Sequence, residues 1–267
     1  MLITKASGET VPFDVEKLRH SLQRVGANPD LIQTVINKIT SIMTEGITTH
    51  EIYKMAFAML RKESRALAAR YHLKRAIMQL GPSGFPFEKF IAELLHQQGY
   101  QVKINVFLQG FCVAHETDVI AEKKDSKYIV ECKYHNHQGI RSDVKVSLYF
   151  HARFQDIIKK TKHEQGWLIT NTKFTDDAIK YGLCAGLKLV SWDFPQQQNL
   201  KDMVEYARLY PITCLTSLSQ GDKIRLLSEN ILLCKTLHRQ PSILQKLHFK
   251  PARIKEVLTE CEILCRE

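Results

Sequence analysis

Two oppositely charged side chains interrupt an apolar strand pattern in the middle of the chain. In the stretch YIVECKYHN, residues 128–136, Glu131 and Lys133 stand among residue types that favour β-strands. Because side chains on a strand alternate between its two faces, the carboxylate and the ammonium emerge on one face, a single pleat apart. This placement fits either an ion pair on an exposed face or part of a catalytic site.

A second carboxylate is expected to lie across from Glu131. The preceding strand-like run, ETDVIAE, is followed by the polar residues KKDS, which predict a hairpin turn. A turn centred between Lys124 and Asp125 puts Asp118 directly opposite Glu131. The prediction depends on the register of this turn, because a loop of odd length would shift the pairing by one residue.

An Asp–Glu pair on facing strands needs a positive partner, because like charges directly opposite one another destabilise a sheet. Hard cations such as Mg²⁺ or Mn²⁺ are held by one or two carboxylates together with waters and a substrate phosphate. Lys133, on the same face, would orient or activate a water, or neutralise charge that develops on the phosphate. Metal Lewis acidity combined with such electrostatic stabilisation is the chemistry of phosphodiester hydrolysis.

The elements that would position these residues alternate between strands and helices. An amphipathic helix with Phe87, Phe90 and Ile91 on one face ends at Gly99. Strand-like runs then lie at 101–108, 116–122, 127–134, 166–170 and 187–192, with helical patterns at about 142–163 and from Thr175 or Asp176. This interleaving indicates an α/β or α+β domain built on a mixed sheet flanked by helices.

Helical patterns occupy both ends of the chain. The N-terminal residues predict a short strand pair followed by helices, the third of which begins with the capping box Thr48-x-x-Glu51. The sequence GPSGFP breaks the pattern before the central segment, and short amphipathic helices return in the last quarter of the chain. We therefore expect a multidomain α+β or α/β chain with domains at 1–82, 83–199 and 200–267.

The composition favours a polyanionic partner. The 267 residues carry 38 Lys+Arg against 28 Asp+Glu, a formal charge of +10, which favours nucleic acid, although a merely basic soluble protein also fits. The seven cysteines are scattered without a CxxC pair, and the sequence lacks a signal-peptide pattern or an apolar run of membrane-spanning length. These features predict reduced thiols, a cytoplasmic location and no membrane association.

The central segment resembles a known nuclease family. D118…E131-C-K133 is similar to the PD-(D/E)xK signature, and its surroundings resemble the Mrr-like restriction endonuclease branch. FEKFIAELLHQQGYQV is similar to the opening helix of that branch, and GWLITNTKFTDDAIKYG…LKLVSWD to its later strand, helix and strand. The likeness covers about 84–195. Thr117 stands before Asp118 where many PD-(D/E)xK nucleases have proline, which this branch commonly lacks.

The resemblance implies a role for each matched residue. Asp118 and Glu131 would ligate the metal, with the carbonyl of Cys132 as a further ligand. Lys133 would be catalytic, and Glu88 would be an auxiliary acid that reaches the metal or its water. The implied substrate is DNA, most often double-stranded, and cleavage of both strands by paired sites implies a homo-oligomer.

Several neighbouring side chains remain open to two interpretations. His135 and His137 could be zinc ligands, or could face solvent or a phosphate. Arg141, Lys145 and Arg153 could touch a nucleic-acid backbone, or could form a solvated helix face. On the helix predicted at about 142–163, Gln155 is the single candidate for a glutamine motif that some relatives carry on this helix.

The N-terminal segment resembles the ATP-cone, the nucleotide-binding module at the front of ribonucleotide reductases and of their transcriptional repressor. The likeness covers about 2–80 and rests on ITKASGETVPFDVEKL, ITTHEIYKMAFAML and ALAARYHLKRAI. It implies that Lys5 and Lys17 meet the triphosphate of ATP or dATP and that Thr49 and Tyr53 lie at the nucleotide.

Two features bear on how this segment would work. Ala6 stands where the family usually has a basic residue, and a helical dimerisation domain without ligand is the alternative. The chain has no GxxxxGK[ST] P-loop, so ATP would be sensed rather than hydrolysed, in keeping with an allosteric role.

The tail resembles paired helix-hairpin-helix units, which grip phosphates through backbone amides. The glycines expected in the two hairpins are replaced by Asn230 and His248, of which Asn tolerates the left-handed conformation better. A plain helical packing or dimerisation domain fits equally well.

Together these features predict a metal-dependent DNA endonuclease that is regulated by ATP or dATP. One alternative is a non-enzymatic, nucleotide-sensing DNA-binding regulator that uses the nuclease fold as a platform. Another is the same chemistry on RNA, since the chain has no recognisable RNA-binding or base-reading motif that would separate the two substrates.

Overall fold

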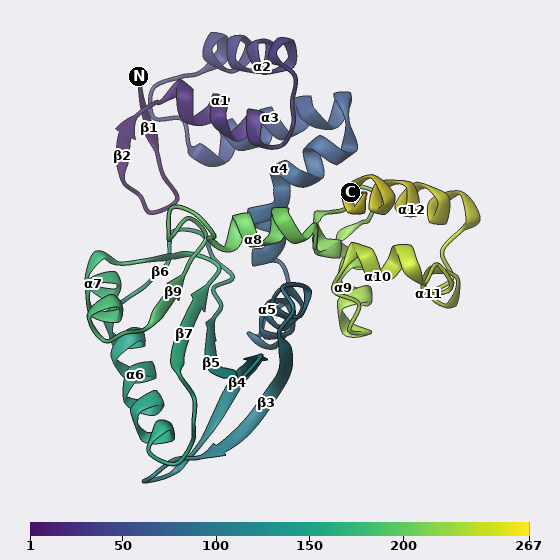
Figure 1. Ribbon diagram of the computed structural model, residues 1–267. Helices are drawn as coiled ribbons and strands as arrows, with labels where there is room; N and C mark the ends of the chain where they lie inside the picture. The colour runs from purple at the N-terminus through teal and green to yellow at the C-terminus, as the bar shows by residue number, and fades with distance from the viewer. Residues whose placement is uncertain (267) are drawn as a thin grey trace. The chain divides into compact units, whose positions relative to one another are not determined.

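The computed structural model describes residues 1–266, and these divide into two compact units (Figure 1). The first unit contains Met1–Ala76, Tyr210–Lys223 and the segment from Leu233 onward. The second contains Ile77–Leu209 and Ile224–Leu232. The two ends of the chain therefore share one unit, and the central segment forms most of the other.

The first unit begins with a strand pair and helices that start at the expected caps. Asp14 accepts hydrogen bonds from the amides of Glu16 and Lys17, and the capping box of Thr48 and Glu51 is complete. The elements are β1 (Leu2–Thr4), β2 (Thr10–Pro12), α1 (Val15–Arg24), α2 (Pro29–Ile42), α3 (Thr49–Glu63) and α4 (Arg65–Met78). Their fully buried core includes Leu22, Val35, Ile39, Ala56 and Leu60.

The C-terminal helices complete the first unit around a buried carboxylate. Glu260 is 2% exposed and accepts 2.8 Å hydrogen bonds from the amides of Thr216 and Ser217, which ties the loop at these residues to the last helix. The elements are a short 3₁₀ helix (Ile212–Cys214), α10 (Cys234–Arg239), α11 (Ser242–Lys246) and α12 (Pro251–Cys265). Two helices cross the division between the units: α4 does so after Ala76, and α9 (Gln220–Ser228) after Lys223.

The second unit is built on a five-stranded mixed sheet with the order β3-β4-β5-β7-β9. β3, β4 and β5 are antiparallel, whereas β5, β7 and β9 are parallel. The strands are β3 (Gln101–Gln109), β4 (Ala114–Lys123), β5 (Ser126–Lys133), β7 (Gln165–Thr170) and β9 (Lys188–Val190), with a separate pair β6 (Arg141–Ser142) and β8 (Lys173–Phe174). The fold class expected from the sequence is confirmed.

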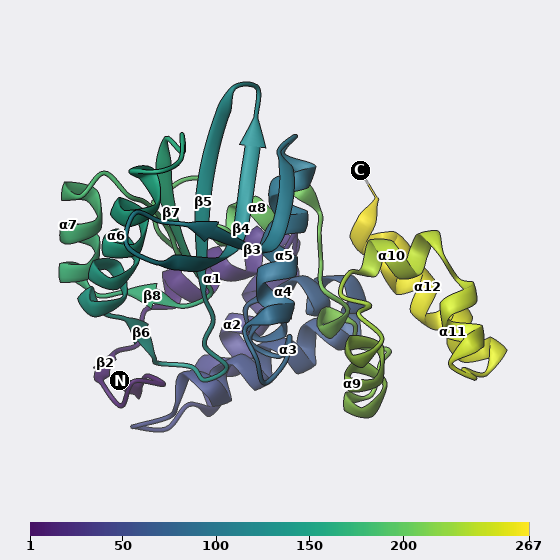
Figure 2. The same ribbon diagram turned by 90° about the horizontal axis from the view of Figure 1, so that it is seen from below.

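Helices cover both faces of this sheet (Figures 1 and 2). On one face, Ile129 of β5 and Leu168 of β7 pack with Phe150 and Phe154 in a single core. On the other face lies the helix that begins just after the GPSG turn, which contacts β3, β4 and β5. The helices are α5 (Phe85–Gln97), α6 (Val144–Ile158), α7 (Asp176–Cys184) and α8 (Leu200–Ala207).

The β4–β5 hairpin has the predicted register. Val119 pairs with Val130, and Lys123 pairs with Ser126 at the turn. Lys124 adopts the left-handed conformation, with φ of 55°, which allows the chain to reverse within two residues. The ladder ends at Val119 and Val130, and one residue beyond it the same register places Asp118 opposite Glu131 on one side of the sheet.

None of the described helices is both long enough and apolar enough to cross a membrane.

Candidate active site

The two predicted metal ligands lie together between β4 and β5. The Oδ2 atom of Asp118 accepts a 2.7 Å hydrogen bond from the amide of Cys132, the residue after Glu131. Both carboxylates are partly buried, whereas the side chain of Cys132 is buried on the opposite face. The structure thus brings together the Asp and Glu that the sequence pairs across the turn.

The positive charge near this carboxylate pair does not offset its burial. Burial raises the pKa of Glu131, and the negative charge of Asp118 raises it further. Burial also raises the pKa of Asp118, against the hydrogen bond from Cys132, which favours its ionised form. Each carboxyl therefore ionises less readily than an isolated one, which is the situation that a bound cation would relieve.

Arg153 of α6 supplies part of the missing charge. Its Nη1 atom donates a 2.8 Å hydrogen bond to Oε2 of Glu131, and its Nη2 atom donates to the carbonyl of Glu116. The sequence left Arg153 open between a nucleic-acid contact and a solvated helix face. In the sequence, the one sign that Arg153 points at the sheet is that it adjoins Phe154, which is buried in the structure.

Lys133 lies on the same face as Glu131 and is exposed at the end of β5, beside Thr170 of β7. Burial dominates the pKa values of Asp118 and Glu131, but the charge of Lys133 is among the influences that lower them. The ammonium of Lys133 therefore influences the ionisation of both carboxyls.

Glu88 of α5 also belongs to this group. Burial, followed by the negative charges of Asp118 and Glu116, raises the pKa of Glu88 to about 7. A carboxyl with such a pKa can both give and take a proton near neutral pH. Glu116, which lies two residues before Asp118, is the acid that sequence reasoning missed.

A metal at this position would rely on two carboxylates and a carbonyl. Across residues 1–266, no group of three or more His, Cys, Asp or Glu side chains is arranged to hold a metal ion. The predicted donor set contains two side chains, those of Asp118 and Glu131, and the backbone carbonyl of Cys132. These are oxygen donors of the kind that Mg²⁺ and Mn²⁺ prefer.

His135 has a different partner from the ones considered in the sequence. Its ring Nε2 lies 3.1 Å from the hydroxyl of Ser142, and burial lowers its pKa. Its amide donates to Oδ1 of Asn171, whose Nδ2 donates back to the carbonyl of His135, at 2.8 and 2.7 Å. This reciprocal pair joins the segment after β5 to the segment after β7, while His137 is exposed.

In the N-terminal segment, the predicted nucleotide residues come from two elements that touch. Thr4, the last residue of β1, forms a bridge with Thr48, the cap of α3. Lys5 therefore leaves β1 next to the start of α3, where Thr49 is the first residue. Lys5 pairs with Glu9 at 3.0 Å in an exposed ion pair. Such pairs contribute little to stability, so the ammonium can exchange partners at small cost.

Two further predicted residues behave differently. Lys17 is exposed and pairs with Asp14, the cap of its own helix, at 3.4 Å. The ring of Tyr53 stacks on Tyr71 with centroids 5.4 Å apart, and the guanidinium of Arg75 covers it at 3.8 Å from its centroid. The ring of Tyr53 therefore has an aromatic and a cationic partner, and Tyr71 and Arg75 are neighbours that the sequence did not reveal.

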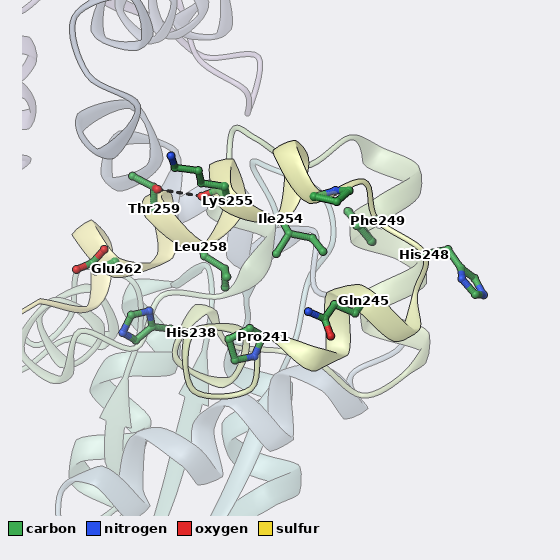
Figure 3. A pocket seen from close by; sticks show the side chains of 11 residues that line it. His238, Pro241, Gln245, His248, Phe249, Ile254, Lys255, Leu258, Thr259 and Glu262 are labelled. Atoms are coloured by element: carbon green, nitrogen blue, oxygen red, sulfur yellow. Dashed lines mark hydrogen bonds between the residues drawn. The ribbon is translucent and has the colours of Figure 1, made fainter.

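The C-terminal helices form a groove of about 830 Å³ between α10, α11 and α12 (Figure 3). Ile254 and Leu258 of α12 face Pro241 across it. Asn230 and His248 both adopt the left-handed conformation, with φ of 60° and 57°, as expected where hairpin glycines are replaced. Both turns thus adopt the left-handed conformation with non-glycine residues.

Three family models match the chain. They describe an ATP cone domain at residues 1–79, a restriction endonuclease at 81–195 and an AF1548-like C-terminal domain at 210–265. The first two confirm the resemblances found in the sequence.

Two relatives span much of the chain. An uncharacterized protein of Archaeoglobus fulgidus is 42% identical over 125 residues, which cover 47% of this chain and 71% of that protein. The crystal structure of the protein of unknown function AF1548 is similar with a TM-score of 0.58 and 32% identity, over 68% of this chain and 98% of its own. The chain therefore belongs to the AF1548-like family, with an ATP cone domain at its N-terminus and a restriction endonuclease-like domain at its centre.

Proposed function

We propose that this protein is a metal-dependent PD-(D/E)xK endonuclease that hydrolyses DNA phosphodiester bonds under the control of ATP or dATP. The observation that supports this most is the β4–β5 register, which gives Asp118 and Glu131 a common face with Lys133. The restriction endonuclease family match supports nuclease chemistry, and the ATP cone match supports nucleotide control.

Asp118, Glu131 and the carbonyl of Cys132 would hold Mg²⁺ or Mn²⁺. The raised pKa values of the two carboxyls support this, because a cation would offset both their burial and their mutual repulsion. When bound, the ion would supply Lewis acidity at the scissile phosphate.

The chain's own side chains would do the remaining work. Lys133 would hold the attacking water and offset negative charge on the phosphate. Glu88, with a pKa near neutrality, would exchange a proton with that water or with the leaving group. Arg153 is a positioning residue, because its bond to Glu131 fixes the orientation of that carboxylate.

Nucleotide control would act through the ATP cone. The absence of a P-loop favours sensing over hydrolysis, so ATP or dATP would change the assembly of the protein rather than fuel it. A homo-oligomer would pair two active sites on opposite strands of DNA.

The test compares cleavage of supercoiled plasmid by wild-type protein and by Lys133→Ala, with Mg²⁺ and with or without ATP. We expect the wild type to cut and Lys133→Ala to cut at least about 100-fold more slowly. Lys127→Ala is the matched control, since Lys127 is an exposed lysine of the same strand that pairs with Glu122 at 3.6 Å.

Equal cleavage by Lys133→Ala and wild type would refute the proposed site. Absence of cleavage under every nucleotide condition would instead favour the non-enzymatic DNA-binding regulator. Cleavage of RNA but not of plasmid would show that the same active site acts on RNA instead of DNA.

A further inference from the structure

A pocket of about 340 Å³ lies in the second unit, between α8 and the edge of the sheet formed by β7 and β9. We call it the α8 pocket. Its remaining walls come from the residue that follows α5 and from the loop that precedes α8. Cavities of this size hold small molecules rather than peptides or nucleic-acid strands.

The sheet supplies one wall of the α8 pocket. Four side chains of β7 and β9 line it: Trp167, Ile169, Lys188 and Val190. They emerge on one face because they alternate along each strand and form two pairs across the ladder. Leu168, which lies between the two lining residues of β7, points to the opposite face and is in register with Glu131 of β5. The α8 pocket therefore lies on the other side of the sheet from the proposed active site.

The helix α8 supplies the opposite wall. Three residues of one helix face line it: Asp202, Met203 and Tyr206. A short connection ties the helix to the end of β9, because the amide of Leu200 donates to the carbonyl of Ser191 at 2.9 Å. Asn199, which is 3% exposed, caps α8 by accepting a 3.0 Å hydrogen bond from the amide of Asp202. The α8 pocket is thus a preformed slot between a sheet and a helix, a shape that suits a flat molecule.

The inner part of the slot is apolar. Ile169 is fully buried, Val190 is 2% exposed and Met203 is 9% exposed. Trp167 is also buried, and its ring lies against that of Tyr128 with the centroids 4.6 Å apart. A ligand of this pocket would therefore bury an apolar body.

One cation and several hydrogen-bonding groups border this apolar part. The ammonium of Lys188 lies 3.7 Å from the ring centroid of Trp167, and partial burial lowers its pKa. Within the described residues, the contact of this ammonium is with a ring rather than with a carboxylate, so its charge is available to an anion. Gln98, Gln198 and Asp202 also line the pocket, and their oxygen atoms can accept hydrogen bonds.

We propose that the α8 pocket binds a small flat molecule that carries one anionic group and a hydrogen-bond donor. The anion would pair with Lys188, the ring would lie between Val190 and Met203, and the donor would meet Asp202 or one of the glutamines. Two kinds of molecule share this chemistry: nucleoside monophosphates and small aromatic acids. The proposal does not rest on the nuclease function, since the lining residues are separate from the carboxylate site.

The experiment measures binding to the full-length protein in EDTA by isothermal titration calorimetry. The probes are dCMP and 4-hydroxybenzoate, each beside its neutral counterpart, deoxycytidine or 4-hydroxybenzamide. We expect at least one anion to bind about 5-fold or more tightly than its counterpart. Lys188→Met should remove this preference, because it keeps an unbranched side chain over Trp167 without the charge. The anion that binds more tightly identifies the kind of ligand.

Three further variants locate the bound probe. Lys180→Met changes an exposed lysine on α7 of the same unit and should bind as wild type does. Met203→Trp should block binding, because the larger side chain fills the slot. Trp192→Phe leaves Trp167 as the one tryptophan of the chain, and its fluorescence should change when the anion binds.

Three results would overturn the proposal. The first is that neither anion binds the wild-type protein. The second is that each anion binds no more tightly than its neutral counterpart. The third is that Lys188→Met binds the anions with wild-type affinity. None of these results depends on cleavage of nucleic acid.

Discussion

Arg153 on α6 donates a 2.8 Å hydrogen bond to Glu131 on β5, and the two side chains are only 15% and 19% exposed. This contact joins the helix to the strand at the point where two carboxylates face one another. The ion pair therefore compensates locally for the Asp118–Glu131 repulsion.

Removing this cation should destabilise the second unit. Arg153→Met leaves a buried carboxylate uncompensated, and we expect it to lower the unfolding free energy by about 2–4 kcal/mol in EDTA. Urea denaturation measures the loss. Adding Glu131→Gln should restore most of it, because the orphaned charge is then gone. Arg266→Met, which breaks an exposed pair with Glu262, is the control and should cost below about 0.5 kcal/mol.

A divalent cation should bind the wild-type protein without substrate. Mg²⁺ or Mn²⁺ at ten times its Kd should stabilise the folded state by about 1.4 kcal/mol, seen as a rise in Tm. Asp118→Asn should abolish that rise, whereas Asp125→Asn, an exposed acid in the hairpin turn, should keep it. If neither Mg²⁺ nor Mn²⁺ raises the Tm of the wild-type protein, the proposed metal site is wrong.

Stability should fall as pH rises through neutrality in EDTA. The folded state holds the proton of Glu88 more tightly than the unfolded chain does, so this stabilisation is present at low pH and is lost between the ordinary value of 4.5 and about 7. Above about pH 7, the free energy of unfolding of Glu88→Gln should exceed that of wild type by up to about 1 kcal/mol. This value is reduced to allow for the partial exposure of Glu88. Thermal melts across pH measure this, and Glu93→Gln on the exposed side of α5 should follow wild type.

Gly110→Ala should disturb the loop that carries Phe111. The added methyl group would meet Oδ2 of Asp156 on α6, so we expect the free energy of unfolding to fall by about 1–3 kcal/mol, measured by urea denaturation. The control is Gly221→Ala in α9, where the nearest atom outside its immediate surroundings is 3.9 Å away and alanine is the better helix former. Wild-type stability in Gly110→Ala would show that the loop between β3 and β4 can shift to make room for the methyl group.

Lys5→Ala should weaken ATP binding to the full chain about 5- to 10-fold, because it removes a charge that the resemblance assigns to the triphosphate. Isothermal titration calorimetry with ATP and dATP measures the change. Lys62→Ala alters an exposed lysine near the end of α3 and should leave affinity unchanged. If Lys5→Ala binds ATP as wild type does, Lys5 has no part in the site.

The carboxylate pair could be predicted because its geometry is local. A short polar turn fixes which residues face one another, and side-chain alternation fixes the face, so Asp118 and Glu131 follow from the hairpin alone.

Contacts between distant elements could not be predicted in this way. Arg153 is 22 residues from Glu131, and its role depends on how α6 rotates over the sheet. The covered ring of Tyr53 depends on the packing of α3 against α4, which brings up Tyr71 and Arg75. Helical periodicity predicts a buried face but not which polar neighbour meets it at the edge.

The division of the chain has a practical consequence for fragments. The backbone passes between the two units after Ala76, Leu209, Lys223 and Leu232, so four peptide connections join them. A single proteolytic cut at one connection leaves the units tethered by the others. A fragment that stops at the end of the ATP cone would also lack α10, α11 and α12, which belong to its own compact unit. Expression of the second unit alone calls for circular permutation or a deletion that rejoins Leu209 to Ile224, rather than simple truncation.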